Sequence, residues 1–256
     1  MLLAAGRGER MRPLTDSCPK PLLQVQGKPL MQWHLEALAR AGCPHVVVNT
    51  AWLDDRIVQA FNDVFVLQTL FNKGEQLHHS EQIKTLPLTY SHEGRDFGGA
   101  LETAGGIVRA LPALGEVFWV LAGDVYTPDF DFSAAAVASF VASGHLAHLW
   151  LVPNPAHNPQ GDFGLQAAGD GNASLALNLA QSDPRPRYTY ATMGLYRRAL
   201  FQPPWCEIAA GNPQGIKAPL AALLRRAMDN QRVSAQLYTG RWTDVGTPQR
   251  LADLNA

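Results

Sequence analysis

Hydrophobic residues along the first half of the chain follow two alternating patterns. Residues 45–49 and 117–121 are continuous apolar runs of strand length, as expected for strands covered on both faces. Between them, apolar positions recur at helical spacing after Pro29 and stop before Gly42, which predicts a helix. Two more helices are predicted, from Leu53 to Phe61 and from near Glu102 to before Pro112. This alternation predicts an α/β protein with a mostly parallel, doubly wound sheet.

The second half is less regular but contains recognisable elements. Residues 147–152 and 188–197 have strand patterns, and an amphipathic helix follows Pro219. Thr247 followed by Pro248 is typical of a helix start, with threonine as the N-cap and proline at the first helical position.

No clear period runs through residues 62–87, which we interpret as an atypical insertion or a surface excursion. The pair His78 and His79 leaves a metal site open there, although adjacent side chains point apart in most backbones. With no linker or internal repeat, we expect one domain over residues 1–256. Its first lobe would span about 1–128 and its second lobe about 129–256.

Composition narrows the class of protein. The 256 residues are 46% hydrophobic and 17% charged, with a formal net charge of −1. No global field therefore favours nucleic acid or an anionic membrane as a partner. No apolar run approaches the ~18 residues of a membrane span, and no signal-peptide pattern is present. Met1 to Ala5 forms a short strand pattern that we expect to be clipped at its start. The three scattered cysteines favour neither a disulfide framework nor a zinc site, so we expect a cytoplasmic monomer or weak homo-oligomer.

The first strand pattern runs into a loop of small and basic residues. Small residues let a polyphosphate approach the backbone, whose N–H groups form an anion-binding concavity. Arg12 offers a planar fork to phosphate oxygens, and Lys20 offers a mobile point charge. From composition alone, a glycine- and arginine-rich surface loop remains the alternative. The candidate nucleotide-binding residues of this stretch are Leu3, Ala4, Ala5, Gly6, Arg7, Gly8 and Lys20.

Two aspartates stand where a cation site is expected. Gly123 and Asp124 come just past the carboxyl end of an apolar strand, where open α/β sheets bind ligands. Asp244 lies near the carboxyl terminus, between Trp242 and Gly246. Carboxylate oxygens with positions left for water and phosphate suit Mg²⁺. The local alternative is that each aspartate only shapes its own turn or loop.

The start of the third predicted helix, with Glu102 and Thr103, offers free backbone N–H groups against which a base can lie. Simple helix-entry chemistry explains the same residues equally well. Neither a dinucleotide-binding motif nor a P-loop motif is present near the amino terminus.

Three motifs taken together resemble the sugar nucleotidyltransferase family, whose members join a nucleoside triphosphate to a sugar 1-phosphate. Residues 6–15 and 19–21 resemble its G-x-G-x-R-(M/L)-x-P-x-T…P-K-P fingerprint. A G-D pair follows the central strand, and a W-x-D-x-G-T stretch lies near the carboxyl end. The resemblance implies a Rossmann-like, doubly wound mixed sheet of the GT-A-like kind without a carboxyl-terminal β-helix. It also implies catalysis by Arg12, Lys20 and Asp124, with Mg²⁺ shared by Asp124 and Asp244.

The resemblance also assigns a sugar half to the site. Residues 159–165 resemble the family's D-P-x-x-(Y/F)-G stretch, and residues 190–196 resemble its N-(A/T)-G-(I/L)-Y strand. The sugar-side candidates implied are Asn154, Asp162, Gly164, Thr192 and Asp244. Glu102 replaces the family's usual glycine. The E-K-P motif of hexose-specific members is missing, which weakens a glucose or mannose assignment.

Residues 100–107, 154–163 and 240–251 are most similar to a subgroup of short uridylyltransferases that act on N-acetylmuramate 1-phosphate in peptidoglycan recycling. The expected substrates are therefore UTP and this sugar 1-phosphate. Another nucleotide and sugar 1-phosphate, or a non-catalytic nucleotide-sugar sensor, are the alternatives. The sugar's lactyl carboxylate needs a cation, for which Arg7, Lys28, Arg185 and Arg187 are the candidates.

Overall fold

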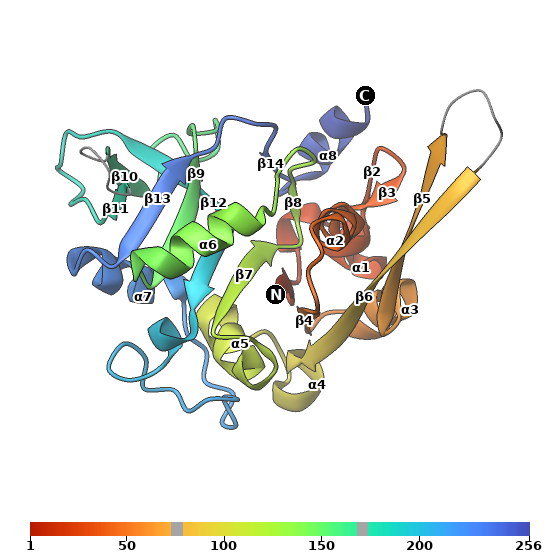
Figure 1. The fold of residues 1–256 in the computed structure, drawn as a ribbon, viewed down its shortest axis with the longest axis horizontal. Helices are drawn as coiled ribbons and strands as arrows, with labels where there is room; N and C mark the ends of the chain where they lie inside the picture. The colour runs from red at the N-terminus through yellow and green to blue at the C-terminus, as the bar shows by residue number, and fades with distance from the viewer. Residues whose placement is uncertain (73–78, 168–173) are drawn as a thin grey trace.

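The centre of the molecule, described here from a computed structural model, is a ten-stranded sheet in the order β10-β11-β13-β9-β12-β7-β1-β4-β6-β5 (Figure 1). The structure describes residues 1–72, 79–167 and 174–256, and side chains except those of residues 69–82. The strands of this sheet are β1 Leu2–Ala4, β4 Val46–Thr50, β5 Val64–Asn72, β6 His79–His92, β7 Val117–Ala122, β9 Ala147–Val152, β10 Phe163–Gln166, β11 Leu175–Leu177, β12 Arg187–Arg197 and β13 Val233–Leu237.

Strand direction divides the sheet in two. Strands β7, β1, β4 and β6 run parallel, as the alternating strand and helix patterns predict. Strand β12 then runs antiparallel to both β7 and β9, while β13 is parallel to β9. The prediction of a doubly wound mixed sheet is confirmed, with antiparallel pairs in the second half of the chain and at the β5 edge of the first half.

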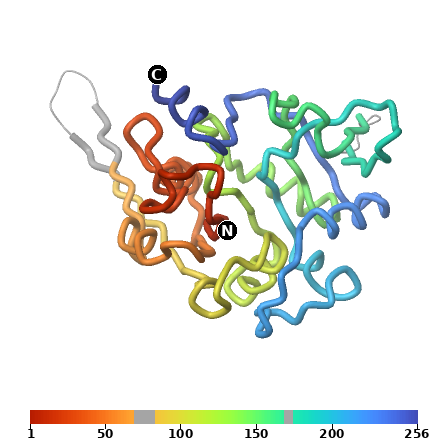
Figure 2. Tube along the Cα trace, turned by 180° about the vertical axis from the view of Figure 1, so that it is seen from behind, coloured from red at the N-terminus to blue at the C-terminus, as the bar shows by residue number. Residues whose placement is uncertain are grey.

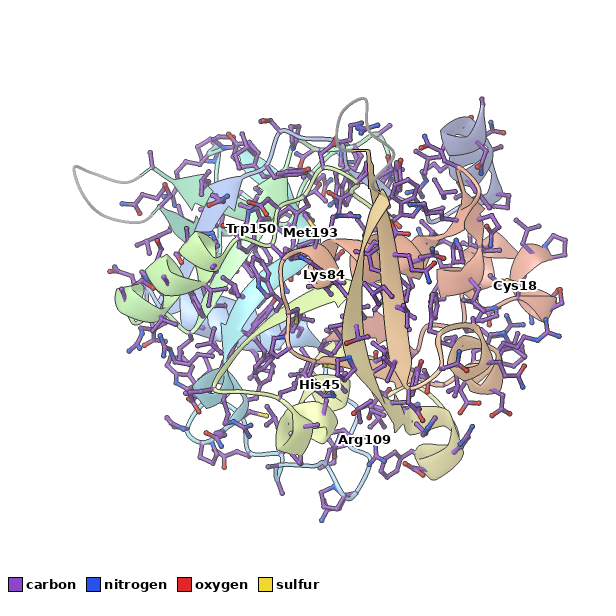
Figure 3. The ribbon with its side chains drawn as sticks, turned by 45° about the vertical axis from the view of Figure 1, so that its right-hand side comes forward. Cys18, His45, Lys84, Arg109, Trp150 and Met193 are labelled. Carbon is purple, nitrogen blue, oxygen red and sulfur yellow. The ribbon has the colours of Figure 1, made fainter. Side chains whose placement is uncertain are left out.

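Both faces of the sheet are covered, which explains the continuous apolar runs. In β4, Val47 packs into one core layer while Val46 and Val48 pack into the opposite one. Trp150 and Met193 lie in the second layer on the paired strands β9 and β12 (Figure 3). The helices that flank the sheet and its connections are α1 Leu14–Ser17, α2 Leu30–Arg40, α3 Asp54–Phe61, α4 Glu93–Phe97, α5 Glu102–Ala110, α6 Ala134–Ser143, α7 Leu220–Asp229 and α8 Pro248–Asn255.

Helix boundaries follow the predicted start and stop signals closely. Pro29 occupies the N-cap of α2 rather than its first turn, and Gly42 follows the helix with φ of +74°. The side chain of Thr247 accepts from the backbone N–H of Arg250 at 3.3 Å, and so caps α8 as predicted. Short 3₁₀ turns complete the connections: η1 Glu9–Met11, η2 Lys20–Leu22, η3 Leu111–Ala113 and η4 Arg198–Phe201.

Strands that the sequence did not indicate lie within residues 62–87. Strand β5 and the first part of β6 pair antiparallel, and the second part of β6 pairs in parallel with β4. These paired strands stand at one edge of the sheet, beyond β4 (Figure 1 and Figure 2). The exposed positions Val64, Val66 and Ile83 are apolar like the buried ones, so the alternation of buried and exposed side chains leaves no apolar/polar pattern in the sequence. The side chains of His78 and His79 lie outside the described residues.

Two short pairings bring the ends of the chain to the middle of the sheet. Strand β8, Val125–Tyr126, pairs with β14, Thr243–Asp244, directly after β7. Strand β2, Gln24–Val25, pairs with β3, Lys28–Pro29, and contacts α8. Within the described ranges, no helix combines the length and the apolar character that a membrane crossing requires.

Candidate active site

A cavity of about 610 Å³ opens at the carboxyl ends of β1, β4 and β7 and extends toward β12 and α7. This is the edge at which open α/β sheets bind ligands, because loops from neighbouring strands converge there. The lining residues are Leu3, Ala4, Ala5, Gly6, Lys20, Pro21, Asn49, Glu93, Ala100, Glu102, Thr103, Val120, Ala122, Asp124, Asp162, Phe163, Tyr190, Thr192, Pro219, Leu220, Ala221, Leu224 and Arg225.

The loop after β1 reaches the cavity with its first residues, and its remainder is shaped by internal contacts. Gly8 adopts φ of +69°, and its carbonyl accepts from Thr15 Oγ1 at 2.8 Å. Arg7 donates to the carbonyl of Thr15 at 2.8 Å and lies over the ring of Trp52, with its guanidinium carbon 3.7 Å from the centroid. Arg7 and Gly8 therefore hold the loop in place and do not line the cavity, whereas residues 3–6 line it as predicted.

Three charged residues meet where the cavity adjoins a second pocket: Lys20 and Asp124 line the cavity, and Asp244 lines the neighbouring pocket. Lys20 Nζ lies 2.5 Å from Asp124 Oδ2 and 4.0 Å from Asp244 Oδ1, with the lysine side chain only 9% exposed. Gly123 lets this junction form: its N–H donates to the carbonyl of Leu3 at 2.9 Å, and an added Cβ would lie 3.0 Å from that oxygen. The predicted convergence of Lys20, Asp124 and Asp244 is thus present in the structure.

Asp244 is oriented by its own neighbours. Arg250 Nη1 donates to Asp244 Oδ2 at 2.9 Å, and His157 Nε2 lies 3.3 Å from the same oxygen. The pairing of β14 with β8 sets Asp244 opposite Val125, one residue after Asp124. One carboxylate oxygen of Asp244 is therefore engaged on the outer side, while the other faces the ammonium of Lys20.

The donor set at this junction fits a magnesium ion. In the described part of the chain, no group of three or more Asp, Glu, His or Cys side chains could hold a metal by itself. Mg²⁺ sites of phosphate-handling enzymes commonly need only one or two carboxylates, because substrate phosphates and waters complete the shell. Asp124 and Asp244 provide two such carboxylates around one cationic position.

The base-side wall is held by a buried carboxyl that sequence reasoning missed. Glu93 is fully buried and accepts from the backbone N–H of Leu101 and from Asn49 Nδ2, both at 2.7 Å. Asn49 Oδ1 in turn accepts from the N–H of Ala4 at 2.9 Å. Burial raises the pKa of Glu93 above its usual range. The network ties the loop after β1 to the start of α5, where Thr103 lines the cavity.

Two cavity residues adopt a left-handed backbone that is unusual outside glycine. Glu102 has φ of +59° and Thr192 has φ of +57°. A glycine stands at the position of Glu102 in the resembling family, which agrees with this conformation. Such strained positions persist only where surrounding structure imposes them, and they cluster at ligand sites.

Of the predicted sugar-side residues, the structure brings only some to the cavity. Asp162 and Thr192 line it, and Asp162 Oδ2 accepts from the N–H of Tyr190 at 2.8 Å. Asn154 instead braces a loop, donating to the carbonyl of Arg187 at 3.0 Å. Gly164 packs against Leu179, whose Cδ1 would lie 2.5 Å from an added Cβ. These last two residues have packing and bracing roles here.

The structure does not bring Arg12 to the cavity. Its side chain is 54% exposed and pairs with Asp16 at 3.0 Å. Arg10 is better placed, because an ideal Cβ at Gly246 would lie 3.2 Å from Arg10 Nη2 and 3.0 Å from Asp244 Oδ2. The signal that identifies Arg10 is the fingerprint itself, whose arginine stands two residues after the second glycine.

The other basic residues proposed for a sugar carboxylate also lie outside the cavity lining. Lys28 Nζ pairs with Glu36 Oε2 at 2.7 Å, and Arg185 Nη2 pairs with Asp183 Oδ2 at 2.7 Å. Arg187 donates to the carbonyl of Leu179 at 3.1 Å. Each of these side chains has a partner elsewhere in the described structure, and their role toward the sugar stays a prediction.

Comparison with known proteins identifies the family of the chain. The chain matches the nucleotidyl transferase family over residues 1–256 and belongs to that family. An N-acetylmuramate alpha-1-phosphate uridylyltransferase from Neisseria meningitidis is 43% identical over 100% of this chain and 96% of its own length. A protein of the same name from Caulobacter vibrioides is 30% identical over 97% of this chain and 92% of its own length.

Solved structures show the same fold at low identity. A Bacillus anthracis protein, described as a glucose-1-phosphate thymidylyltransferase and solved with sucrose, superposes with a TM-score of 0.72 at 17% identity. The match covers 99% of this chain and 92% of the other. The nucleotidyltransferase fold predicted from the sequence is thereby confirmed.

Proposed function

We propose that this protein transfers the uridylyl group of UTP to N-acetylmuramate 1-phosphate, giving UDP-N-acetylmuramate and pyrophosphate. The observation that carries the proposal is full-length similarity to the Neisseria meningitidis uridylyltransferase, at 43% identity over the whole chain. Support comes from the charged junction of Lys20, Asp124 and Asp244 at the edge of a 610 Å³ cavity. A sensor without catalysis would not need this junction.

The proposed reaction needs no protein nucleophile. A phosphate oxygen of the sugar 1-phosphate attacks the α-phosphorus of UTP, and the bond to the departing pyrophosphate breaks. Catalysis then rests on positioning and on neutralising charge. Lys20 would contact phosphate oxygens at the junction. Arg10, whose guanidinium lies close to Gly246, would bind the departing pyrophosphate, a role for which Arg12 is the second candidate.

Asp124 and Asp244 would hold Mg²⁺, which supplies charge neutralisation on the phosphates of both substrates. Arg250 and His157 hold the second oxygen of Asp244, so this carboxylate keeps its orientation toward the junction. The backbone after β1 and the first turn of α5, with Thr103, would enclose the base and ribose. The remaining cavity, near Asp162 and Thr192, would receive the sugar ring.

The proposal includes a role in peptidoglycan recycling and a cytoplasmic location, in a monomer or weak homo-oligomer. Free cysteines at positions 18, 43 and 206 agree with a reducing compartment.

A pyrophosphate-release screen tests the proposal. UTP, GTP, CTP and dTTP are each combined with the 1-phosphates of N-acetylmuramate, N-acetylglucosamine, glucose and mannose, with and without Mg²⁺. We expect the highest rate for UTP with N-acetylmuramate 1-phosphate, and loss of that rate when EDTA removes the metal. A preference for another pair would overturn the substrate assignment, and release of no pyrophosphate from any pair would favour a sensor.

A further inference from the structure

A site that selects N-acetylmuramate must recognise a carboxylate. The lactyl group of this sugar carries one, and N-acetylglucosamine lacks it. A carboxylate removed from water needs a cation or several hydrogen-bond donors, because an unpaired buried charge is costly. The arginines and lysine first considered for this role are engaged elsewhere.

Two basic side chains line the cavity within the described residues. Lys20 belongs to the phosphate end and is already paired with Asp124. Arg225, on α7, is the other. In the described part of the chain, its guanidinium takes part in none of the hydrogen bonds, ion pairs or ring contacts. It therefore stands as an uncommitted, exposed cation at the cavity wall.

Helix geometry places Arg225 on the cavity-facing side of α7. Ala221, Leu224 and Arg225 lie three and four residues apart on α7, so they share one face, and all three line the cavity. Leu224 is 1% exposed and anchors that face in the core layer behind the sheet. The face thus presents Arg225 to the cavity from a packed helix, which is a more rigid mount than a loop.

Asp162 is the acidic residue of the proposed sugar side that could pair with Arg225 in place of a ligand carboxylate. Asp162 has both carboxylate oxygens occupied, by the N–H of Tyr190 at 2.8 Å and by Asn158 Nδ2 at 3.3 Å. Among the described residues, no ion pair joins Asp162 to Arg225, so the guanidinium keeps its donors for a ligand. A planar guanidinium binds a carboxylate through two parallel hydrogen bonds, which gives direction as well as attraction.

We infer that Arg225 binds the lactyl carboxylate of the sugar 1-phosphate and is the specificity-determining residue of the site. The inference rests on the proposed function. It adds a residue that neither motif nor spacing indicates, because its position depends on how α7 packs.

The test compares two sugars in three variants. Arg225→Gln should lower the specificity constant for N-acetylmuramate 1-phosphate by roughly 10- to 150-fold, the range of a charged hydrogen bond. The constant for N-acetylglucosamine 1-phosphate should change by less than about threefold. The loss should fall mainly on KM, because the carboxylate takes no part in bond breaking. Arg225→Lys should recover part of the preference.

Arg226→Gln is the matched control. Arg226 is exposed on the next position of the same helix, but it donates to the carbonyl of Trp205 at 3.3 Å and lies 5.6 Å from that ring. This variant should keep the preference between the sugars. A substrate whose lactyl carboxylate is converted to an amide gives an independent arm: the wild type should lose rate with it, and Arg225→Gln should lose no more.

The two ways to fail are distinguishable. If the wild type shows no preference for N-acetylmuramate 1-phosphate, the proposed function is wrong. If it shows the preference and Arg225→Gln keeps it, the function stands and the assignment of Arg225 is wrong. Equal losses for both sugars in Arg225→Gln would also contradict the assignment, since they would indicate a structural role.

Discussion

The phosphate end and the sugar end of the cavity are built in different ways. At the phosphate end, the carboxylates of Asp124 and Asp244 both lie within 4.0 Å of the Lys20 ammonium. Each follows or flanks a short motif, so the chain itself places them. At the proposed sugar end, Asp162, Thr192 and the proposed specificity residue Arg225 come from separate elements, and two other predicted residues do not line the cavity. The residues proposed to bind phosphate and metal, which every substrate needs, can thus be recognised from the short motif around each. The residues proposed to select the sugar depend on how separate elements pack.

The largest expected loss of turnover comes from a substitution at the phosphate end alone. Asp124→Asn removes a charged oxygen ligand and the partner of Lys20, and turnover should fall by at least about a hundredfold for every sugar 1-phosphate alike. Asp129→Asn is the control, because Asp129 pairs with Arg241 on the surface. Steady-state rates at limiting and saturating Mg²⁺ provide the measurement. Near-normal turnover at limiting Mg²⁺ would rule out the assigned metal ligand.

A smaller effect separates the two arginines near the same end. Arg10→Ala should impair pyrophosphate use in the reverse reaction by about tenfold or more, since it removes a charged contact. Arg12→Ala should reduce pyrophosphate use by a smaller factor, because Arg12 is paired with Asp16 and half exposed. Reverse-reaction kinetics with varied pyrophosphate decide between them. A larger loss in Arg12→Ala would restore the assignment made from sequence.

A substitution at the sugar end should act on stability rather than on selection. In Gly164→Ala the added methyl group would lie 2.5 Å from Leu179 Cδ1, so overpacking should lower the free energy of unfolding by ~1–3 kcal/mol. The ratio of specificity constants for the two N-acetylated sugars should remain. Urea unfolding together with kinetics checks both statements. A changed ratio at unchanged stability would make Gly164 a substrate-contacting residue after all.

Acid should lower the free energy of unfolding through two buried histidines, one in each half of the chain. Burial lowers the pKa of His34 and of His148 to about 4. A base with a lowered folded pKa holds less proton than the unfolded chain, so stability is complete above pH ~6.5 and falls as the pH drops toward 4. For His34, whose Nε2 donates to the carbonyl of Val125 at 2.8 Å, the loss between pH 7 and 5 should be ~2 kcal/mol.

Urea unfolding at the two pH values provides this measurement. His34→Gln should flatten the pH dependence by the contribution of His34. An unchanged dependence in that variant would assign the acid sensitivity to other groups.

The features that the sequence predicted are those set by local motifs, and the features it missed depend on packing. Strand runs such as 45–49, helix signals such as Thr247 with Pro248, and the acids after strands are local, and they were found. The edge hairpin of β5 and β6 was not, because its exposed positions, such as Val64 and Val66, are as apolar as its buried ones. Glu93 was missed because a buried glutamate cannot be told from a surface one by residue type. Arg225 was missed because only the packing of α7 turns it toward the cavity.

The most direct test of the account is the wild-type ratio of specificity constants for N-acetylmuramate 1-phosphate and N-acetylglucosamine 1-phosphate, each measured with UTP at saturating Mg²⁺. A cation that meets the lactyl carboxylate predicts a preference of at least about tenfold for the muramate sugar. Equal use of the two sugars, or a clear preference for glucose 1-phosphate, would contradict the account of the sugar end.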